Sequence, residues 1–430
     1  MSFKFIGLAM AMTLSVAQAQ AETQNNLAPC SGADNQIEVI NLARATRLAL
    51  EADRRPELAK AEIRAARAER AIAALRPADT VSLDVEDFPG TGLASNIDNL
   101  QITGRFSRVW ERGGKQDARI ALAESGVGVA EAIFRAANFE IRSEIETLYA
   151  EAALAQRRVE LACDEVEISI ELERSIKKRV DAARDPLLAG ARAKSQRLQA
   201  EAEVRHFDAR AQAVREALGA YWQRNRDFQI NPKYLTTRPP SQSVFYTEVY
   251  SPVFDRLDAE RRQTVAQIDL ERTKAVPDVT WNVGVRKFGY QEDLAIIGGV
   301  SIPLGTKKRS RASVAKVYAE QRRIKVARQT HQQGLLRKAA GYSREAQNAA
   351  EEISQIDNRL IPAAMEAVEL AQEGYDRGAF SYLDIVDAQR SIAALREERL
   401  THLRTYILNT TALERLSPSM GSETLPEETQ

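Results

Sequence analysis

The chain has 430 residues, and its 60 Lys and Arg residues balance its 60 Asp and Glu residues. This balance argues against a generic nucleic-acid-binding protein, because such proteins usually carry a basic excess. Three His and two Cys residues are too few for a zinc-finger array or a disulfide scaffold. A charged fraction of 28% with a mean hydropathy of −0.37 excludes a helical-bundle membrane protein.

Both ends of the chain differ in composition from the rest. Residues 1–21 contain Lys4, a short apolar run and then small residues with A-x-A spacing, the order of a secretory signal peptide. We therefore expect export from the cytoplasm. No later stretch reaches about 18 consecutive apolar residues, so entry into a membrane would have to use strands. Residues 417–430 are polar, acidic and proline-containing, and we expect them to be disordered.

The two cysteines, Cys30 and Cys163, leave three alternatives open. The residues before Cys30 weakly resemble a lipid-attachment box. A disulfide between the two is allowed in an oxidising compartment. Free thiols are the third alternative, with Cys163 as a small buried residue on a helix.

The mature chain repeats its order of elements. Pro56 and Pro252 begin equivalent helical runs 196 residues apart. The first repeat covers 22–224 and the second covers 244–416, and each reads as helix, two strands, long helix, turn and long helix. Residues 225–243 contain three prolines and are expected to form an irregular connector.

Each repeat contains one predicted β-hairpin, at about 80–110 and about 278–304. The strands alternate apolar and polar residues, and their lengths suit tilted membrane-spanning strands. Four strands cannot close a barrel, and lipid cannot satisfy open sheet edges. If these hairpins cross a membrane, several chains must therefore share one barrel. The alternative is a pair of soluble hairpins that pack on the helices.

The long segments carry a heptad pattern. Apolar residues over Ile141–Val166 and Ala339–Gly374 alternate spacings of three and four, which is typical of a coiled-coil seam. Turns are expected near Asp181–Pro186 and Arg377–Tyr382. Each long helical segment would be about 100 Å long at about 1.5 Å per residue. Pro362 lies within the second long helix and is expected to kink it.

The segment Gly374–Arg390, which reads GYDRGAFSYLDIVDAQR, resembles the signature of the TolC family of outer-membrane efflux channels. A second resemblance is to the heavy-metal, cobalt–zinc–cadmium type, branch of that family. It is carried by Pro277–Thr280, Gly284–Phe288, Gly299–Leu304 and the exit of the first hairpin at Glu111–Lys115. The resemblance follows the element order of the whole mature chain.

The resemblance implies a mainly α fold with a small β part, made of long antiparallel coiled-coil helices and two β-hairpins per chain. Three chains of four strands each would form a 12-stranded outer-membrane β-barrel above a periplasmic α-barrel. The implied partners are two further copies of the chain, outer-membrane lipid, a periplasmic membrane-fusion adapter and an inner-membrane resistance-nodulation-division pump. The host would be a Gram-negative bacterium, with most of the chain in its periplasm.

The implied function is that of a passive conduit, with heavy-metal cations as the expected cargo. A multidrug or small-organic channel of the same fold is one alternative. A periplasmic coiled-coil structural or adapter protein is the alternative from another class. Such a protein would not need two amphipathic hairpins per chain.

Two aspartates of the matching segment, Asp384 and Asp387, are the pore candidates. In the family their positions line the periplasmic constriction, where stacked rings of negative charge would favour cation passage. The alternative is helix capping, because both residues follow a predicted turn.

Tyr375 matches a family position that holds the tip closed through hydrogen bonds between helices. The alternative for Tyr375 is ordinary packing in the seam. Phe380 stands where the family has an arginine, so we expect a different closing network. The candidates for contact with the adapter lie at the two predicted turns: Asp185, Pro186, Leu187, Ser381, Tyr382 and Leu383.

No enzyme constellation is present in the sequence. His206, His331 and His402 lie far apart and lack neighbouring ligands at metal spacing, so we expect no metal site. We find no phosphate-binding loop, so we expect no cofactor and infer that a partner supplies energy. The basic run Lys307–Arg311 is interpreted as a solvated or interfacial cluster rather than as a nucleic-acid patch.

Overall fold

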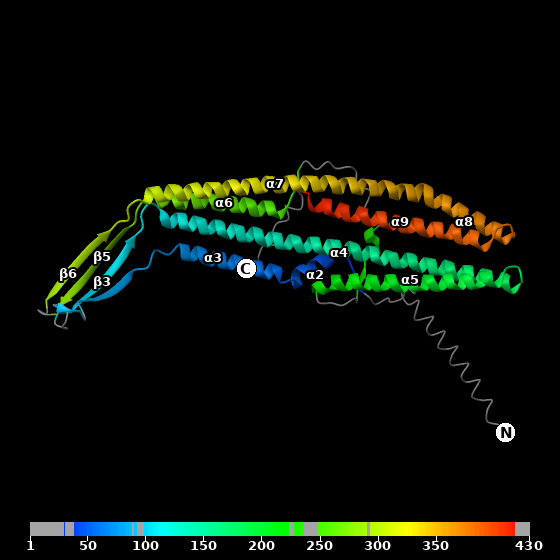
Figure 1. Cartoon of the computed structure of the whole chain (residues 1–430), viewed down its shortest axis with the longest axis horizontal. Coiled ribbons are helices and arrows are strands. Elements are labelled where there is room, and N and C mark those ends of the chain that lie inside the picture. The colour runs from blue at the N-terminus through cyan, green and yellow to red at the C-terminus, as the bar shows by residue number, and fades with distance from the viewer. Residues whose placement is uncertain are drawn as a thin grey trace, which may run out of the picture. The chain divides into compact units, whose positions relative to one another are not determined.

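A computed structural model gives the fold of this chain (Figure 1). It describes residues 30, 38–87, 90–92, 99–222, 228–235, 248–289 and 293–417. The predicted signal peptide and all but the first residue of the predicted tail lie outside the described residues. The fold is mainly helical with two β-hairpins, as predicted. None of the described helices is both long and apolar enough to span a lipid bilayer.

The chain forms two compact units, and both sequence repeats contribute to each. We call them the helical unit, residues 1–53, 139–250 and 335–430, and the sheet unit, residues 54–138 and 251–334.

The sheet unit is built around a four-stranded antiparallel sheet in the order β2-β3-β5-β6. Its strands are β2 (Thr80–Glu86), β3 (Gln101–Trp110), β5 (Val279–Phe288) and β6 (Leu294–Ser301). The central pair β3 and β5 comes from different repeats and joins them along ten residue pairs, for example Phe106 with Val283. The strands β2 and β6 are the two edges.

Helices enter and leave this sheet through short connections. The unit contains α3 (Arg55–Ala73), α6 (Pro252–Thr273) and the first parts of α4 (Lys115–Asp181) and α7 (Thr306–Gln355). Ser251 caps α6 by accepting a hydrogen bond from the Val253 amide at 3.3 Å. The turn from β3 into α4 needs glycine at Gly113, because φ is +82° and a Cβ would lie 2.9 Å from Val276 Cβ.

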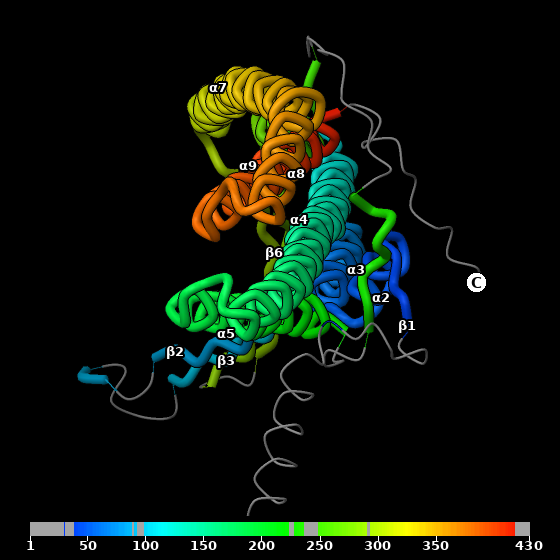
Figure 2. The backbone as a smooth tube through the Cα atoms, turned by 90° about the vertical axis from the view of Figure 1, so that its right-hand side faces the viewer, coloured from blue at the N-terminus to red at the C-terminus, as the bar shows by residue number. Residues whose placement is uncertain are grey.

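The helical unit contains two helical hairpins. The first pairs the end of α4 with α5 (Leu187–Gly219), and the second pairs α8 (Ile361–Asp376) with α9 (Tyr382–Arg415) (Figure 2). The predicted turns therefore lie where the sequence places them, between Asp181 and Leu187 and between Asp376 and Tyr382.

A small parallel sheet organises the rest of this unit. The strands β1 (Glu38–Ile40) and β4 (Phe228–Ile230) pair in parallel, next to α2 (Leu42–Ala52) and the short 3₁₀ helices Ala220–Trp222 and Pro232–Leu235. The prediction of an irregular connector over 225–243 is thus wrong for residues 228–235.

Burial explains why this part of the connector is ordered. Ile40, Phe228 and Ile230 are buried against Ile141 and Tyr149 of α4. The Tyr149 hydroxyl donates to the Ile40 carbonyl at 2.8 Å and accepts from the Asn231 amide at 3.2 Å.

The first predicted seam is confirmed, and the second is correct only for its first part. Along α4, six of the eight predicted seam residues are buried. Along α7 the seam holds as far as Ile356, but Leu360 is 46% exposed and Leu370 is 56% exposed. Burial resumes one position later, at Ala371 and Tyr375.

The cause of this shift is a π-helical turn over Ile356–Leu360, directly before Pro362. A proline inside a helix lacks an amide donor and clashes with the carbonyl four residues earlier, and a wider turn relieves both problems. A π turn adds one residue to the helix, so every later seam position moves by one. The predicted kink is therefore realised as a change of register.

Cys30 and Cys163 form a disulfide, with their Cα atoms 5.5 Å apart. This bond decides among the three alternatives that the sequence leaves open.

Candidate functional site

The tips of the two helical hairpins form the first candidate site, and both lie in the helical unit. The turn after α8 is closed by hydrogen bonds from the Ala379 and Phe380 amides to the Gly374 carbonyl, at 2.8 and 3.2 Å. Gly378 has a φ of +78°, the left-handed conformation that favours glycine after a helix. The turn after α4 places Ala183 at a φ of +55°.

A three-residue network links the two hairpins. The Tyr375 hydroxyl on α8 donates to the Asp185 carboxylate in the turn after α4. Arg179 on α4 donates through Nε to Asp185 Oδ2 at 3.0 Å and through Nη1 to the Tyr375 carbonyl at 2.9 Å. The Arg179 guanidinium also lies 4.2 Å from the centre of the Tyr375 ring.

This network is well shielded from water. Tyr375 is 1% exposed, and the side chains of Arg179 and Asp185 are 18% and 13% exposed. Burial and the hydrogen bond to Asp185 raise the pKa of the Tyr375 hydroxyl well above its ordinary value, so it stays a neutral donor. Tyr375 therefore both packs in the seam and carries an inter-hairpin hydrogen bond.

Arg179 is missing from the sequence-based candidates, although the repeat contains a signal for it. At the 196-residue offset Arg179 is the counterpart of Tyr375, and Asp185 is the counterpart of Ser381. The network thus joins equivalent positions of the two repeats. Arg179 supplies a guanidinium to the tip network.

Asp384 caps α9. Its Oδ2 accepts hydrogen bonds from the Ser381 amide and the Ser381 hydroxyl, both at 2.7 Å. These bonds lower the pKa of the Asp384 carboxyl below its ordinary value. Both bonds go to Oδ2, and the Asp384 side chain is exposed. Asp387, one turn further on, is exposed.

The other tip candidates differ in exposure. Leu187 is 83% exposed and Leu383 is 49% exposed, and Pro186 and Ser381 are also exposed. Tyr382 is instead buried at 8%, and its hydroxyl donates to Gln196 Oε1 of α5 at 3.1 Å. Two further apolar residues of the tips are exposed, Leu188 at 58% and Phe380 at 49%, and neither is among the predicted adapter-contact residues.

The four-stranded sheet is the second candidate site, because its two faces differ in chemistry. Residues paired directly across strands share a face. One face carries exposed apolar side chains from β2, β5 and β6, including Leu83 at 70%, Val285 at 50% and Ile296 at 84%. Trp110 and Trp281 lie on this face at the end nearest the helices.

The other face is polar and internally paired. Arg286 on β5 donates to Thr103 Oγ1 at 2.9 Å on β3 and to Glu86 Oε2 at 3.1 Å on β2. A second pair on this face joins Arg105 and Asp84 at 3.3 Å. The sheet is thus largely amphipathic, with Arg286 and Arg105 paired on the polar face and mostly apolar groups exposed on the other. Two basic residues also lie on the apolar face: Arg108, which pairs with Asp79 at 2.5 Å, and Lys287.

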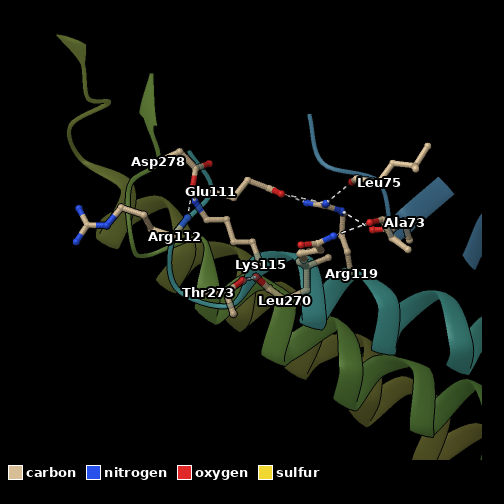
Figure 3. A network of polar contacts seen from close by, with 11 residues as sticks. Ala73, Leu75, Glu111, Arg112, Lys115, Arg119, Leu270, Thr273 and Asp278 are labelled. Carbon is tan, nitrogen blue, oxygen red and sulfur yellow. Dashed lines mark hydrogen bonds and ion pairs between the residues drawn. The ribbon is translucent and has the colours of Figure 1, made fainter. Parts of the chain in front are cut away.

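A polar network fixes the junction of the sheet with its helices (Figure 3). Lys115 Nζ donates to Asp278 Oδ1 at 2.6 Å, which ties the start of α4 to the residue before β5. Arg119 donates to Glu111 Oε2 at 3.1 Å and to the Leu75 carbonyl at 3.0 Å. Lys115 is only 9% exposed, so its charge depends on Asp278 for compensation.

Within the described residues, no group of three or more His, Cys, Asp and Glu side chains is arranged to hold a metal ion.

Paired helical hairpins joined to an amphipathic antiparallel sheet are the fold of known transmembrane channels. The crystal structure of CusC, reported in terms of conformational changes that accompany folding and transmembrane channel formation, matches this chain with a TM-score of 0.68. The match covers 89% of this chain and 94% of CusC at 17% identity, which establishes the fold.

Sequence comparison adds similarity to efflux and metal-resistance proteins. Residues 251–419 match the family described as "Outer membrane efflux protein". The chain is 27% identical over 309 residues to the cobalt-zinc-cadmium resistance protein CzcC of Cupriavidus metallidurans, over 70% of this chain and 73% of CzcC. It is 29% identical to the nickel and cobalt resistance protein CnrC of the same organism, over 61% of this chain and 64% of CnrC.

Proposed function

We propose that this chain is the outer-membrane channel of a tripartite efflux system and a passive conduit for heavy-metal cations. In this proposal an inner-membrane resistance-nodulation-division pump delivers the cations through a periplasmic adapter. The observation that carries the proposal is the amphipathic sheet. A large exposed apolar face with open edges is unfavourable in water, and insertion of that face into lipid removes the cost.

The open edges argue for a trimer. The strands β2 and β6 are unpaired at the outer sides of the sheet within the described residues, and open edges are not tolerated in the hydrocarbon region. Three copies that pair β2 of one chain with β6 of the next would close a barrel and place the polar face with Arg286 and Arg105 toward an aqueous lumen.

The tips supply the proposed gate and the adapter contact. The bond between Tyr375 and Asp185 holds two hairpins of one chain together, so it restrains any widening that separates them. Asp384 is exposed while it caps its helix, so the cap does not exclude pore lining. Exposed Leu187 and Leu383 offer an apolar contact for the adapter.

The cargo assignment rests on the named relatives. CzcC is named for resistance to cobalt, zinc and cadmium, and CnrC for resistance to nickel and cobalt. We extend divalent metal cations to this chain as the cargo. Because no described residues form a chelating cluster, the cations would pass without tight binding, as release from a conduit requires.

Two neighbouring residues of β5 provide a matched test of the placement of the sheet. Val283 lies on the apolar face and is 45% exposed, and Asn282 lies on the polar face. We expect Val283→Arg to destabilise the membrane-inserted state by about 2–4 kcal/mol, because a charge would face lipid. Asn282→Arg faces the lumen and is expected to insert normally.

The assay is the yield of the full chain in purified outer membranes, followed by channel activity in planar lipid bilayers. The proposal predicts conducting wild-type and Asn282→Arg chains and a strongly reduced yield for Val283→Arg. Recovery of the wild-type chain from the soluble periplasm without conductance would support a structural coiled-coil protein instead.

A further inference from the structure

A strongly basic segment lies at the start of α7. Lys307, Lys308, Arg309 and Arg311 are all exposed. Within the described part of the chain, none of their side chains forms an ion pair, and the first turn of α7 contains no acidic residue. Four positive charges within five residues at the N-terminus of a helix are unfavourable, because they repel one another and the positive end of the helix dipole. We call these four residues the basic cluster.

The equivalent position of the first repeat is built differently. Lys115 and Arg119 also begin a long helix directly after a strand, but each is paired, with Asp278 and Glu111 respectively. The first turn of α4 also contains Asp117. The same junction can therefore be made electrostatically neutral, and the basic cluster lacks such compensation.

The basic cluster directly follows the apolar face of the sheet. Ile302 is 48% exposed and Leu304 is 93% exposed, and Leu304 precedes Lys307 by three residues. Trp110 and Trp281 mark this same end of the sheet, with exposures of 64% and 36%. The order here is apolar strands, then tryptophans and then basic residues. Membrane proteins show the same order from the hydrocarbon core to the headgroup region.

We propose that the basic cluster binds the phosphate groups of anionic phospholipids in the leaflet on the helical side of the sheet. This inference rests on the proposed insertion of the strands and adds a lipid preference to it. Lysine and arginine pair with phosphate, and the charges left uncompensated by the protein would be compensated by the headgroups. In a trimer the cluster would recur three times around the barrel.

Trp110 and Trp281 allow a direct measurement of contact with each lipid. The full-length chain, in a Trp222→Phe background, is reconstituted into vesicles of phosphatidylcholine with brominated phosphatidylglycerol or brominated phosphatidylcholine at equal mole fraction. Trp222 is 8% exposed in the helical unit, so its removal leaves Trp110 and Trp281 as the reporters. The ratio of quenching by the two brominated lipids then gives their relative affinity for the surface around Trp110 and Trp281.

The test variant is Lys307→Gln/Lys308→Gln/Arg311→Gln. Its matched control, Lys316→Gln/Arg322→Gln/Lys325→Gln, removes the same three charges from exposed positions further along α7. A charge-retaining variant, Lys307→Arg/Lys308→Arg/Arg311→Lys, keeps the cluster positive if the neutral variant fails to insert.

We expect the wild type to prefer the anionic lipid by about fivefold or more at low salt, since one basic group near an anionic surface contributes a factor of about five. The preference should fall by about fivefold or more in the test variant, which loses three of the four charges, and persist in the control and charge-retaining variants. Equal quenching by both lipids in the wild type would overturn the lipid preference while supporting insertion of the strands. No quenching by either lipid would instead overturn the proposed function on which the inference rests.

Discussion

The substitution Tyr375→Phe, which removes a single oxygen, distinguishes two roles of Tyr375: a hydrogen bond that holds the tip closed, or packing in the seam. The substitution keeps the aromatic ring in the seam and its contact with Arg179, and deletes only the hydrogen bond to Asp185. A hydrogen bond to a charged group contributes about 1.5–3 kcal/mol when it is buried. At about 1.4 kcal/mol per factor of ten, the ratio of open to closed tips should rise by about tenfold to a hundredfold per chain.

The assay is the open probability of single channels in planar bilayers, compared with thermal stability. Tyr318→Phe is the control, because it removes an exposed tyrosine hydroxyl that accepts a hydrogen bond from Arg272 within the sheet unit. We expect Tyr375→Phe to conduct more often and Tyr318→Phe to behave as the wild type. If Tyr375→Phe has the open probability of the wild type while Tyr375→Ala is thermally destabilised, the gate is refuted and the role of Tyr375 is packing in the seam.

Three further predictions concern the helical unit. Asp384→Asn with Asp387→Asn should weaken block of the pore by divalent cations, as measured by conductance titration; unchanged block would remove both residues from the pore. Gly378→Ala should cost about 1 kcal/mol in thermal unfolding, because a Cβ at its φ of +78° is strained although no atom lies within 4 Å, whereas Gly378→Asn should cost less. Burial, and then the charge of Glu203, raise the pKa of Glu165. Ionised Glu165 therefore lowers the free energy of unfolding above that pKa, and this loss of stability disappears as the pH falls and the carboxyl is protonated. Glu165→Gln should therefore raise Tm at pH 8 more than at pH 4.5, and an equal effect at both pH values would contradict this sign.

The regular elements were predictable because their periods are strong. The two strand patterns, the first heptad segment, the second as far as Ile356 and the two turns follow from local spacing, and the structure confirms them. The order β2-β3-β5-β6 brings the repeats together through long-range pairing, which local patterns do not specify.

The misses have identifiable physical causes. The heptad count continues through Leu360 and Leu370, because spacing alone cannot register the residue that a π turn adds before Pro362. The strand Phe228–Ile230 is too short to show a period, and its pairing with Glu38–Ile40 is remote in sequence. Arg179 was overlooked because its role depends on contact with the other repeat, although the 196-residue offset points to it.

The central claim is export of heavy-metal cations, and a growth panel of a deletion strain tests it most directly. Inhibitory concentrations of zinc, cobalt, cadmium and nickel are compared with those of dyes, detergents and antibiotics. Complementation uses the wild-type chain and, as an uninserted control, Val283→Arg. We predict selective sensitisation to the divalent metals that the wild type rescues and Val283→Arg does not. Sensitisation to organic compounds alone would contradict the metal cargo and favour a multidrug channel of the same fold.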